Sequence, residues 1–178
     1  MNQAINRLAK DAAAGTLKTR THGDFHLGQV LVSSGDAYII DFEGEPARPL
    51  DERRAKSSPL RDVAGLLRSF DYAVAAAASR AQGPAQNAPS KATVLDRFAV
   101  EAAAAFLAAY RAAHAESPVQ WTTEGSEPAL LDLFLIEKAA YEICYEAANR
   151  PAWIGIPLHG LARIVARLTA PVMEAADG

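Results

Sequence analysis

Two short motifs on either side of an apolar segment constrain this chain more than any other feature of its sequence. The first motif reads HGDFHLGQ at residues 22–29, and the second reads IDFE at residues 40–43. The first places one carboxylate, Asp24, and one side-chain amide, Gln29, within a short stretch, and the second adds another carboxylate, Asp41. Three oxygen-bearing side chains this close in a sequence are candidates for a common site.

The segment between the motifs is typical of a β-hairpin. Residues 29–32 and 37–40 are rich in β-branched and apolar side chains, and the SSGD sequence at residues 33–36 has the composition of a four-residue turn. Because a hairpin brings its two ends together, Gln29 and Asp41 are expected side by side at its open end.

The spacing of these residues is typical of phosphoryl transfer. In the kinase pattern H-R-D-x-x-x-x-N, the Asp accepts the proton of the attacking hydroxyl and the amide binds a metal ion. Four residues likewise separate Asp24 from Gln29, and Asp41 corresponds to the metal-binding Asp of the D-F-G element. Amide and carboxylate oxygens suit Mg²⁺. Glu43 replaces the Gly of that element and no Arg stands between His22 and Asp24, which favours a small-molecule substrate over a protein.

Three longer stretches carry a resemblance to a known family. They are HGDFHLGQVLV from residue 22, IIDFEGEPARPLDERRAKSSPLRDVAGLLRSFDYA from residue 39 and EKAAYEICYEAANRPAWIGIPLHGL from residue 137. With them, the chain resembles the C-terminal part of bacterial maltokinases over most of its length. That family belongs to the aminoglycoside-phosphotransferase-like kinases and is sometimes fused to trehalose synthase.

The resemblance implies ATP-dependent phosphorylation of maltose to maltose 1-phosphate, on the route to α-glucan such as glycogen. It implies that Asp24 is the catalytic residue, which positions the sugar hydroxyl. Gln29 and Asp41 would then hold Mg²⁺ with ATP as cosubstrate, and trehalose synthase is an implied partner.

The sequence has no counterpart of the N-terminal lobe of such a kinase. No glycines fit G-x-G-x-x-G or a Walker A loop, and no strand with a V-A-I-K-like lysine precedes the catalytic loop. Residues 1–178 are therefore interpreted as one domain, the C-terminal catalytic lobe of a protein-kinase-like fold. Phosphoryl transfer depends on positioning the triphosphate, so this lobe is expected to be inactive without an N-terminal lobe.

Composition argues against several other classes of protein. The chain is 50% hydrophobic, which suits one sizeable core, and its net charge of -3 gives no reason to expect a nucleic acid or a membrane as partner. Cys144 is the single cysteine and no signal peptide is visible, so a cytoplasmic location is expected.

The rest of the chain is expected to be mostly helical, which makes the predicted fold class α+β, mainly helical, with a small β-hairpin. Residues 59–80 carry an apolar stripe after a proline, which is tolerated in the first turn of a helix. The other helices predicted from periodicity and breakers cover residues 2–14, 91–115, 128–149 and 157–171. Residues 44–58 are predicted to be irregular and residues 83–90 to form a loop.

Aromatic side chains on one predicted helix are candidates for the sugar-binding site. Tyr141 and Tyr145 are four residues apart, so their rings share a helix face and can stack on a sugar. Tyr72 and Arg163, on two other predicted helices, are expected to complete the site. An aromatic pair at helical spacing is also typical of core packing, and the sequence leaves both interpretations open.

Two residues near the motifs also have two interpretations. Glu43 either binds a second Mg²⁺ or pairs with Arg53 or Arg54. Asp62 either anchors the catalytic loop, as the resemblance implies, or stabilises the N-terminus of its own helix.

Two other functions remain open from the sequence. His22, Asp24 and His26 form an H-x-D-x-H group of the kind that binds a transition metal in a metal-dependent hydrolase. Support of the loop by His22 and packing of His26 beneath it are favoured over that hydrolase. The third alternative is a non-catalytic module that binds the sugar or contacts trehalose synthase.

Overall fold

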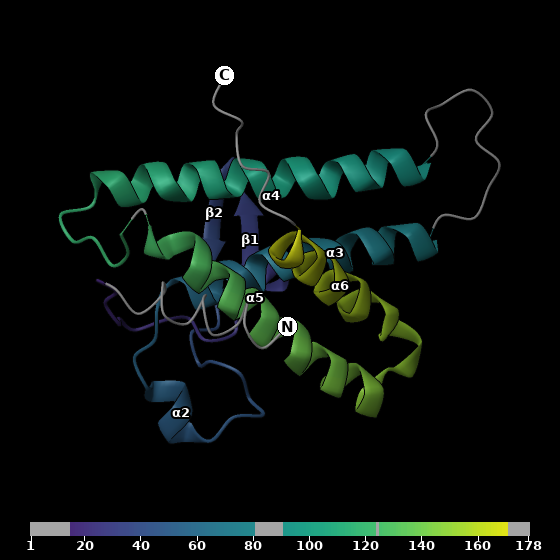
Figure 1. Cartoon of the computed structure of the whole chain (residues 1–178), viewed down its shortest axis with the longest axis horizontal. Coiled ribbons are helices and arrows are strands. Elements are labelled where there is room, and N and C mark those ends of the chain that lie inside the picture. Colours follow the sequence, from purple (N-terminus) through teal and green to yellow (C-terminus); the bar gives the residue numbers. More distant parts are fainter. Residues whose placement is uncertain (1–14, 81–90, 124, 171–178) are drawn as a thin grey trace.

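The computed structural model describes residues 15–80, 91–123 and 125–170 (Figure 1). Its elements are η1 (Leu27–Gln29), β1 (Val30–Ser33), β2 (Asp36–Ile39), α2 (Leu50–Arg54), α3 (Leu60–Arg80), α4 (Lys91–Glu116), α5 (Ser126–Asn149), η2 (Pro151–Trp153) and α6 (Gly155–Thr169). In Figure 1, α4 runs along the top of the view, above α3, α5 and α6. The expected fold class, mainly helical α+β with a small two-stranded sheet, is confirmed.

Helix α3 is the centre of the core. It begins directly after Pro59, and its apolar stripe faces the other long helices, all three of which it contacts. Leu60 and Ala64 are 0% exposed and pack with Val63 and with Leu131 of α5. The position of α3 is therefore fixed on several sides, and any loop bound to α3 inherits that rigidity.

Helices α5 and α6 pack on each other and on α3. The short 3-10 helix η2 joins them, and Pro157 lies buried in the first turn of α6. Ile164 of α6 is also buried. This arrangement brings α3, α5 and η2 around one side of the molecule.

The β-hairpin is tighter than the sequence predicted. Ser33 pairs with Asp36, so the connection has two residues rather than four. The two connecting residues have positive φ angles, 53° at Ser34 and 87° at Gly35. Two positive φ angles define a type I′ turn, whose twist matches that of the two strands.

Part of the segment predicted to be irregular is helical. Within residues 44–58, the short helix α2 has Asp51 and Glu52 in its first turn and Arg53 and Arg54 in its last turn. This order of charges suits the helix dipole. The prolines of this segment, Pro46 and Pro49, both precede the helix and do not interrupt it.

The other helix predictions agree with α3, α4, α5 and α6 to within two residues at each end. The helix predicted over residues 2–14 and the loop over residues 83–90 lie outside the described residues. In the part of the chain that is described, no helix is both long and apolar enough to cross a membrane.

Replacement of Leu60 by alanine tests the packing of α3. Because Leu60 is fully buried in the main cluster, we expect Leu60→Ala to lower the free energy of unfolding by about 2–5 kcal/mol in urea denaturation. The control is Leu158→Ala in α6, whose leucine is 46% exposed. Equal losses in the two variants would contradict this assignment of the core.

Candidate active site

The loop that carries Asp24 is anchored to α3 by Asp62. The backbone N–H of His22 donates to Oδ2 of Asp62 at 2.7 Å, and the N–H of Gly23 donates to Oδ1 at 2.9 Å. Burial raises the pKa of Asp62 above its ordinary value, and the two backbone donors act in the opposite direction. Asp62 lies in the first turn of α3, so both roles considered for it are compatible with its position.

His22 joins the two sequence motifs. Its Nε2 lies 2.7 Å from the carbonyl oxygen of Ile40, and its Nδ1 faces the backbone N–H of Asp24 at 3.4 Å. These partners suit a neutral ring with the proton on Nε2. The ring also packs against Phe25 and Phe42, with centroids 5.4 and 4.8 Å apart. The favoured interpretation of His22, support of the loop, agrees with this geometry.

A close approach between loop and helix depends on Gly65. A Cβ atom at this position of α3 would lie 2.5 Å from the carbonyl oxygen of Phe25. One turn later, Oγ of Ser69 accepts a hydrogen bond from the backbone N–H of Leu27 at 3.1 Å. The loop around Asp24 therefore lies directly on the backbone of α3.

Gln29 and Asp41 lie side by side at the open end of the hairpin, as expected. The backbone N–H of Ile40 donates to the carbonyl oxygen of Gln29 at 3.0 Å, and Nε2 of Gln29 donates to Oδ2 of Asp41 at 3.1 Å. Asp41 has a φ of 64°, an uncommon conformation for a residue other than glycine. Such residues cluster at functional sites, where the surrounding structure holds them in place.

The pair fits a cation that prefers oxygen ligands. When Gln29 donates through Nε2, its Oε1 stays free to face an ion beside the Asp41 carboxylate. Mg²⁺ is usually bound by one or two protein oxygens together with phosphates and water. Glu43 is exposed, and its contact with Arg53 runs through the main-chain carbonyl of Glu43 at 3.3 Å, so this contact supports neither of its two proposed roles.

The alternative metal site at His22, Asp24 and His26 is not supported. Among the described residues, no group of three or more His, Cys, Asp or Glu side chains is arranged to bind a metal. The ring of His26 accepts a hydrogen bond from the N–H of Gly28 at 3.0 Å and caps η1. Nε2 of His26 lies 3.9 Å from Oδ2 of Asp24.

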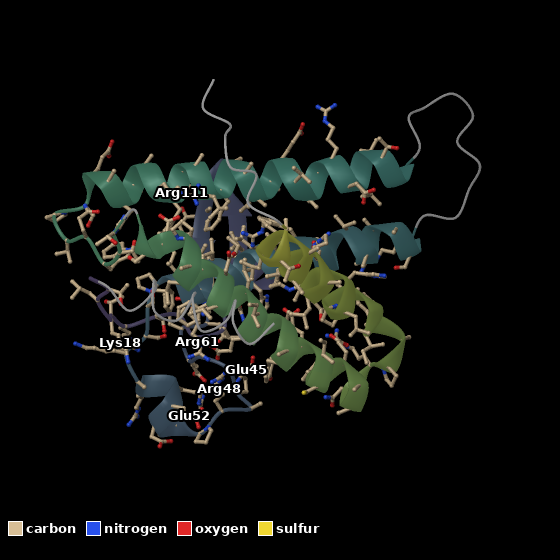
Figure 2. All side chains as sticks on the ribbon, viewed as in Figure 1. Lys18, Glu45, Arg48, Glu52, Arg61 and Arg111 are labelled. Atoms are coloured by element: carbon tan, nitrogen blue, oxygen red, sulfur yellow. The ribbon has the colours of Figure 1, made fainter. Side chains whose placement is uncertain are left out.

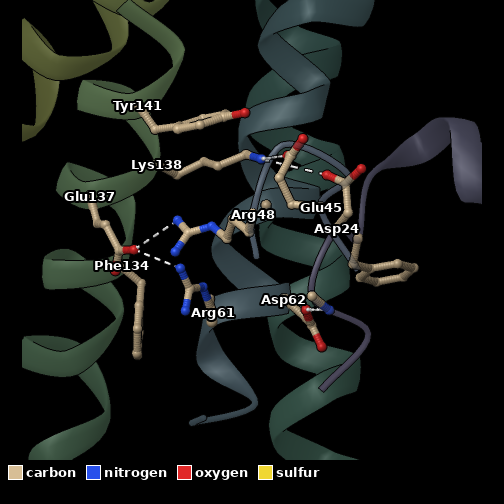
Figure 3. A pocket seen from close by; sticks show the side chains of 12 residues that line it. Asp24, Glu45, Arg48, Arg61, Asp62, Phe134, Glu137, Lys138 and Tyr141 are labelled. Carbon is tan, nitrogen blue, oxygen red and sulfur yellow. Dashed lines mark hydrogen bonds and ion pairs between the residues drawn. The ribbon is translucent and has the colours of Figure 1, made fainter. Parts of the chain in front are cut away.

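Asp24 faces a charged cluster that joins the loop to α5 (Figure 3). Nζ of Lys138 lies 3.8 Å from Oδ1 of Asp24 and 4.0 Å from Oε2 of Glu45, and it sits over the ring of Tyr141. Burial raises the pKa of Tyr141 to about 12, with the nearby Glu45 carboxylate adding to the effect. The contacts of Asp24 with His26, at 3.9 Å, and with Lys138, at 3.8 Å, are both longer than a hydrogen bond. The carboxylate oxygens of Asp24 therefore remain able to accept a hydrogen bond from a substrate.

Two arginines contact the residue that precedes Lys138 on α5. Arg48 and Arg61 both contact Oε1 of Glu137, at 3.4 and 2.7 Å (Figure 3). Figure 2 labels both arginines on the whole chain. Arg48 comes from the loop before α2, and Arg61 comes from the start of α3. Because Glu137 precedes Lys138 on α5, this bridge fixes the helix turn that presents Lys138 to Asp24.

A cavity of about 530 Å³ opens beside Asp24. Its walls include the aromatic side chains Tyr72, Tyr141, Tyr145 and Trp153 and the carboxylates Asp24, Glu45, Glu142 and Glu146. The structure therefore gathers the three predicted tyrosines. It does not bring Arg163 to them: Arg163 is exposed and pairs with Asp71, with NH2 2.7 and 2.6 Å from the two carboxylate oxygens.

Glu146 organises the end of the cavity away from the hairpin. Its side chain is 1% exposed and accepts hydrogen bonds from the Tyr72 hydroxyl at 3.0 Å and from Arg150 at 2.6 and 3.0 Å. Tyr72 stacks on Trp153, with ring centroids 6.3 Å apart. Desolvation raises the pKa of Tyr72, and the Glu142 and Glu146 carboxylates add to that shift, so its hydroxyl remains a donor.

Several residues of this cavity wall were not predicted from the sequence. Lys138, Glu142 and Glu146 all lie on α5, four residues apart, and thus on the same face as the predicted tyrosines. That periodicity was available in the sequence, but it marks a polar helix face without revealing what the face covers. Glu45 and Trp153 have no comparable signal because they reach the cavity from a loop and from η2.

Comparisons with known proteins identify relatives among the sugar kinases. No protein-family profile matches the chain. The chain is 31% identical over 147 residues to the glucosamine kinase of Streptacidiphilus jiangxiensis and 29% identical over 138 residues to that of Mycolicibacterium smegmatis. These matches cover 83% and 76% of the chain but only 32% of each relative, so the chain spans about a third of their length.

Solved structures give the same result. A glucosamine kinase in complex with glucosamine, ADP and inorganic phosphate superposes with a TM-score of 0.76 at 26% identity, over 92% of this chain and 37% of that chain. A second crystal form of a glucosamine kinase gives 0.72 at 26% identity, over 92% and 38%. The expected membership of the maltokinases, within the aminoglycoside-phosphotransferase-like kinases, is wrong, because these relatives and structures are glucosamine kinases. The same comparisons contradict the expected phosphorylation of maltose.

The pH dependence of stability tests the environment of Glu142 in the cavity wall. Burial raises the pKa of this carboxyl above its ordinary value of 4.5, and Arg68 opposes the shift. The contribution of Glu142 to stability is therefore complete below the unfolded-state pKa and is lost as the pH rises through the folded-state pKa. We expect wild-type protein to lose unfolding free energy relative to Glu142→Gln as the pH rises above about 4.5, the ordinary pKa of this carboxyl.

Urea denaturation at a series of pH values measures this difference. The matched control is Glu101→Gln, which removes a carboxylate that is 63% exposed on α4. Parallel pH profiles for wild type and Glu142→Gln would contradict the assigned burial.

Proposed function

We propose that this chain is the sugar-binding and catalytic part of an ATP-dependent glucosamine kinase. One observation supports it above others: Asp24, on a loop anchored to α3, opens onto a cavity walled by aromatic rings and carboxylates. Its volume of about 530 Å³ lies in the range typical of small-molecule sites. The likeness to glucosamine kinases gives this cavity a substrate class.

In the proposed reaction, Asp24 positions a sugar hydroxyl and accepts its proton. The hydroxyl oxygen forms a bond to the γ-phosphorus of ATP, the bond from that phosphorus to the β–γ bridging oxygen breaks, and ADP leaves. Nζ of Lys138 lies 3.8 Å from Oδ1 of Asp24 and places a positive charge beside the group that accepts the proton.

Gln29 and Asp41 are the proposed ligands of a divalent cation, with Mg²⁺ as the expected ion. A bound Mg²⁺ would neutralise charge on the ATP phosphates. The hydrogen bond between Gln29 and Asp41 holds their oxygens together before the cation arrives, which lowers the cost of ordering them. Glu43 is a proposed ligand only for a second ion.

The cavity wall suits an amino sugar. Tyr141 and Tyr145 are stacked with centroids 6.3 Å apart and both line the cavity, where aromatic rings can pack on the apolar C–H surface of a sugar. Carboxylates are the natural partners of the ammonium group that distinguishes glucosamine from glucose, and Glu142 and Glu146 both line the same cavity.

The proposal assigns residues 1–178 to one catalytic lobe of a protein-kinase-like fold. The relatives are about three times as long as the matched segment, and the part that fixes the triphosphate would come from their remaining residues. Because its cosubstrate is ATP, the proposed reaction takes place in the cytoplasm.

Binding of glucosamine to the 178-residue chain tests the proposed sugar site. The cavity is formed by residues of this chain, so we expect saturable binding in isothermal titration calorimetry. Tyr145→Ala should weaken binding by about 0.5–1.5 kcal/mol because it removes a stacking ring. The matched control is Tyr38→Ala, an exposed tyrosine on the hairpin. Absence of binding, or equal affinity of both variants, would argue against the site.

A chimera tests the proposed catalytic roles. The matched segment of the Streptacidiphilus jiangxiensis enzyme is replaced by this chain, and glucosamine-dependent ADP formation is measured. Asp24→Asn should lower turnover by about 10²-fold or more with glucosamine affinity largely retained. Asp41→Asn should instead raise the concentration of magnesium–ATP needed for half-maximal rate.

The control for the chimera is Asp36→Asn, which removes an exposed carboxylate from the turn end of the same hairpin. Near-normal turnover of the Asp24→Asn chimera would refute the role of Asp24. Equal effects of the Asp36 and Asp41 variants on magnesium–ATP would refute the metal site.

A further inference from the structure

Arg68 occupies a buried position between three helices. It lies on α3, its side chain is only 3% exposed, and it faces α5 and α6. Its Nε and NH2 atoms both donate to Oε2 of Glu142, at 2.9 and 2.8 Å. Its NH1 atom donates to Asp71, which also binds Arg163 of α6. The guanidinium is thus held on two sides by carboxylates.

Gly160 of α6 provides the space for this guanidinium. A Cβ atom at residue 160 would lie 2.0 Å from NH1 of Arg68 and 2.7 Å from its Cζ. A glycine inside a helix is unfavourable by itself, because the backbone loses more freedom than with alanine. The close approach of Arg68 explains why residue 160 is a glycine.

The arrangement determines how Glu142 meets the cavity. Both hydrogen bonds from Arg68 reach the same oxygen, Oε2, which leaves Oε1 unengaged by Arg68. Glu142 lines the large cavity beside Tyr141 and Tyr145. A carboxylate fixed through one oxygen presents the other in a defined direction, as a preorganised acceptor does.

We infer that Arg68 and Gly160 are positioning residues for the sugar site, which hold Glu142 so that its Oε1 accepts a hydrogen bond from the bound sugar. This inference rests on the proposed glucosamine-binding function. A buried ion pair is by itself weak evidence for a role in stability, because desolvation offsets the attraction between the charges. Because Glu142 lines the cavity, the pair can act in sugar binding.

Gly160→Ala tests the inference with a small change to the chain. The added methyl group must displace the guanidinium, so we expect glucosamine affinity, measured by calorimetry on the 178-residue chain, to fall about tenfold. The matched control is Gly155→Ala in the same helix, where an added Cβ meets no atom within 4 Å and affinity should not change. Circular dichroism and thermal unfolding of each variant show whether it is folded.

A double-mutant cycle separates positioning from packing. Arg68→Lys keeps the charge but lacks the branch that carries NH1, so Gly160→Ala should have little further effect on affinity in that background. It also provides the test if Gly160→Ala alone does not fold. Additive effects in the cycle, or unchanged affinity of folded Gly160→Ala, would overturn the inference while leaving the proposed function intact. Failure of the wild-type chain to bind glucosamine would overturn both.

Discussion

The acceptance of two backbone N–H groups by the Asp62 carboxylate is the interaction on which the candidate site depends. Asp62 belongs to the helix that contacts all the other long helices of the described structure, so its position is fixed by the core. Through it, the loop of Asp24 becomes as rigid as α3, and the contact at Gly65 reinforces the attachment. His22 extends the rigidity to the second motif by its hydrogen bond to Ile40. In the proposed function Asp24 is the catalytic carboxylate, which must be held in place to act, and the core supplies that constraint.

Residues of α3 and α5 make up most of the cavity wall, and its charges are largely compensated within the structure. Lys138 faces Asp24 and Glu45, Arg68 faces Glu142, and Arg150 faces Glu146. Each carboxylate is thereby kept close to a cation in a partly buried place, where an unpaired charge would be costly. Oε1 of Glu142 stays unengaged by Arg68, whereas both oxygens of Glu146 accept hydrogen bonds from Tyr72 and Arg150.

The motifs and the cavity wall carry different information about function. In the proposed function, Asp24, Gln29 and Asp41 act on the phosphoryl group and its cation, so these residues carry no information about a particular sugar. In the same proposal, the choice of sugar depends on side chains that reach one cavity from α3, α5 and η2. The maltokinase resemblance rested on stretches of sequence, which do not show which side chains meet in the cavity. The relatives are glucosamine kinases, so they contradict the expected maltokinase and support an ATP-dependent sugar kinase.

The sequence by itself determined the helices α3 to α6, the hairpin and the adjacency of Gln29 and Asp41, because periodicity and turn composition act over a few residues. It also placed Tyr141 and Tyr145 on a common face, since a helix repeats every 3.6 residues. Only the tertiary structure decided that Tyr72 joins them and Arg163 does not, because Arg163 is bound to Asp71 at the surface of α6. It alone brought Lys138 to Asp24 and Arg68 to Gly160, since these contacts join segments far apart in the chain. Local patterns cannot record such distances, which are set by how the helices pack.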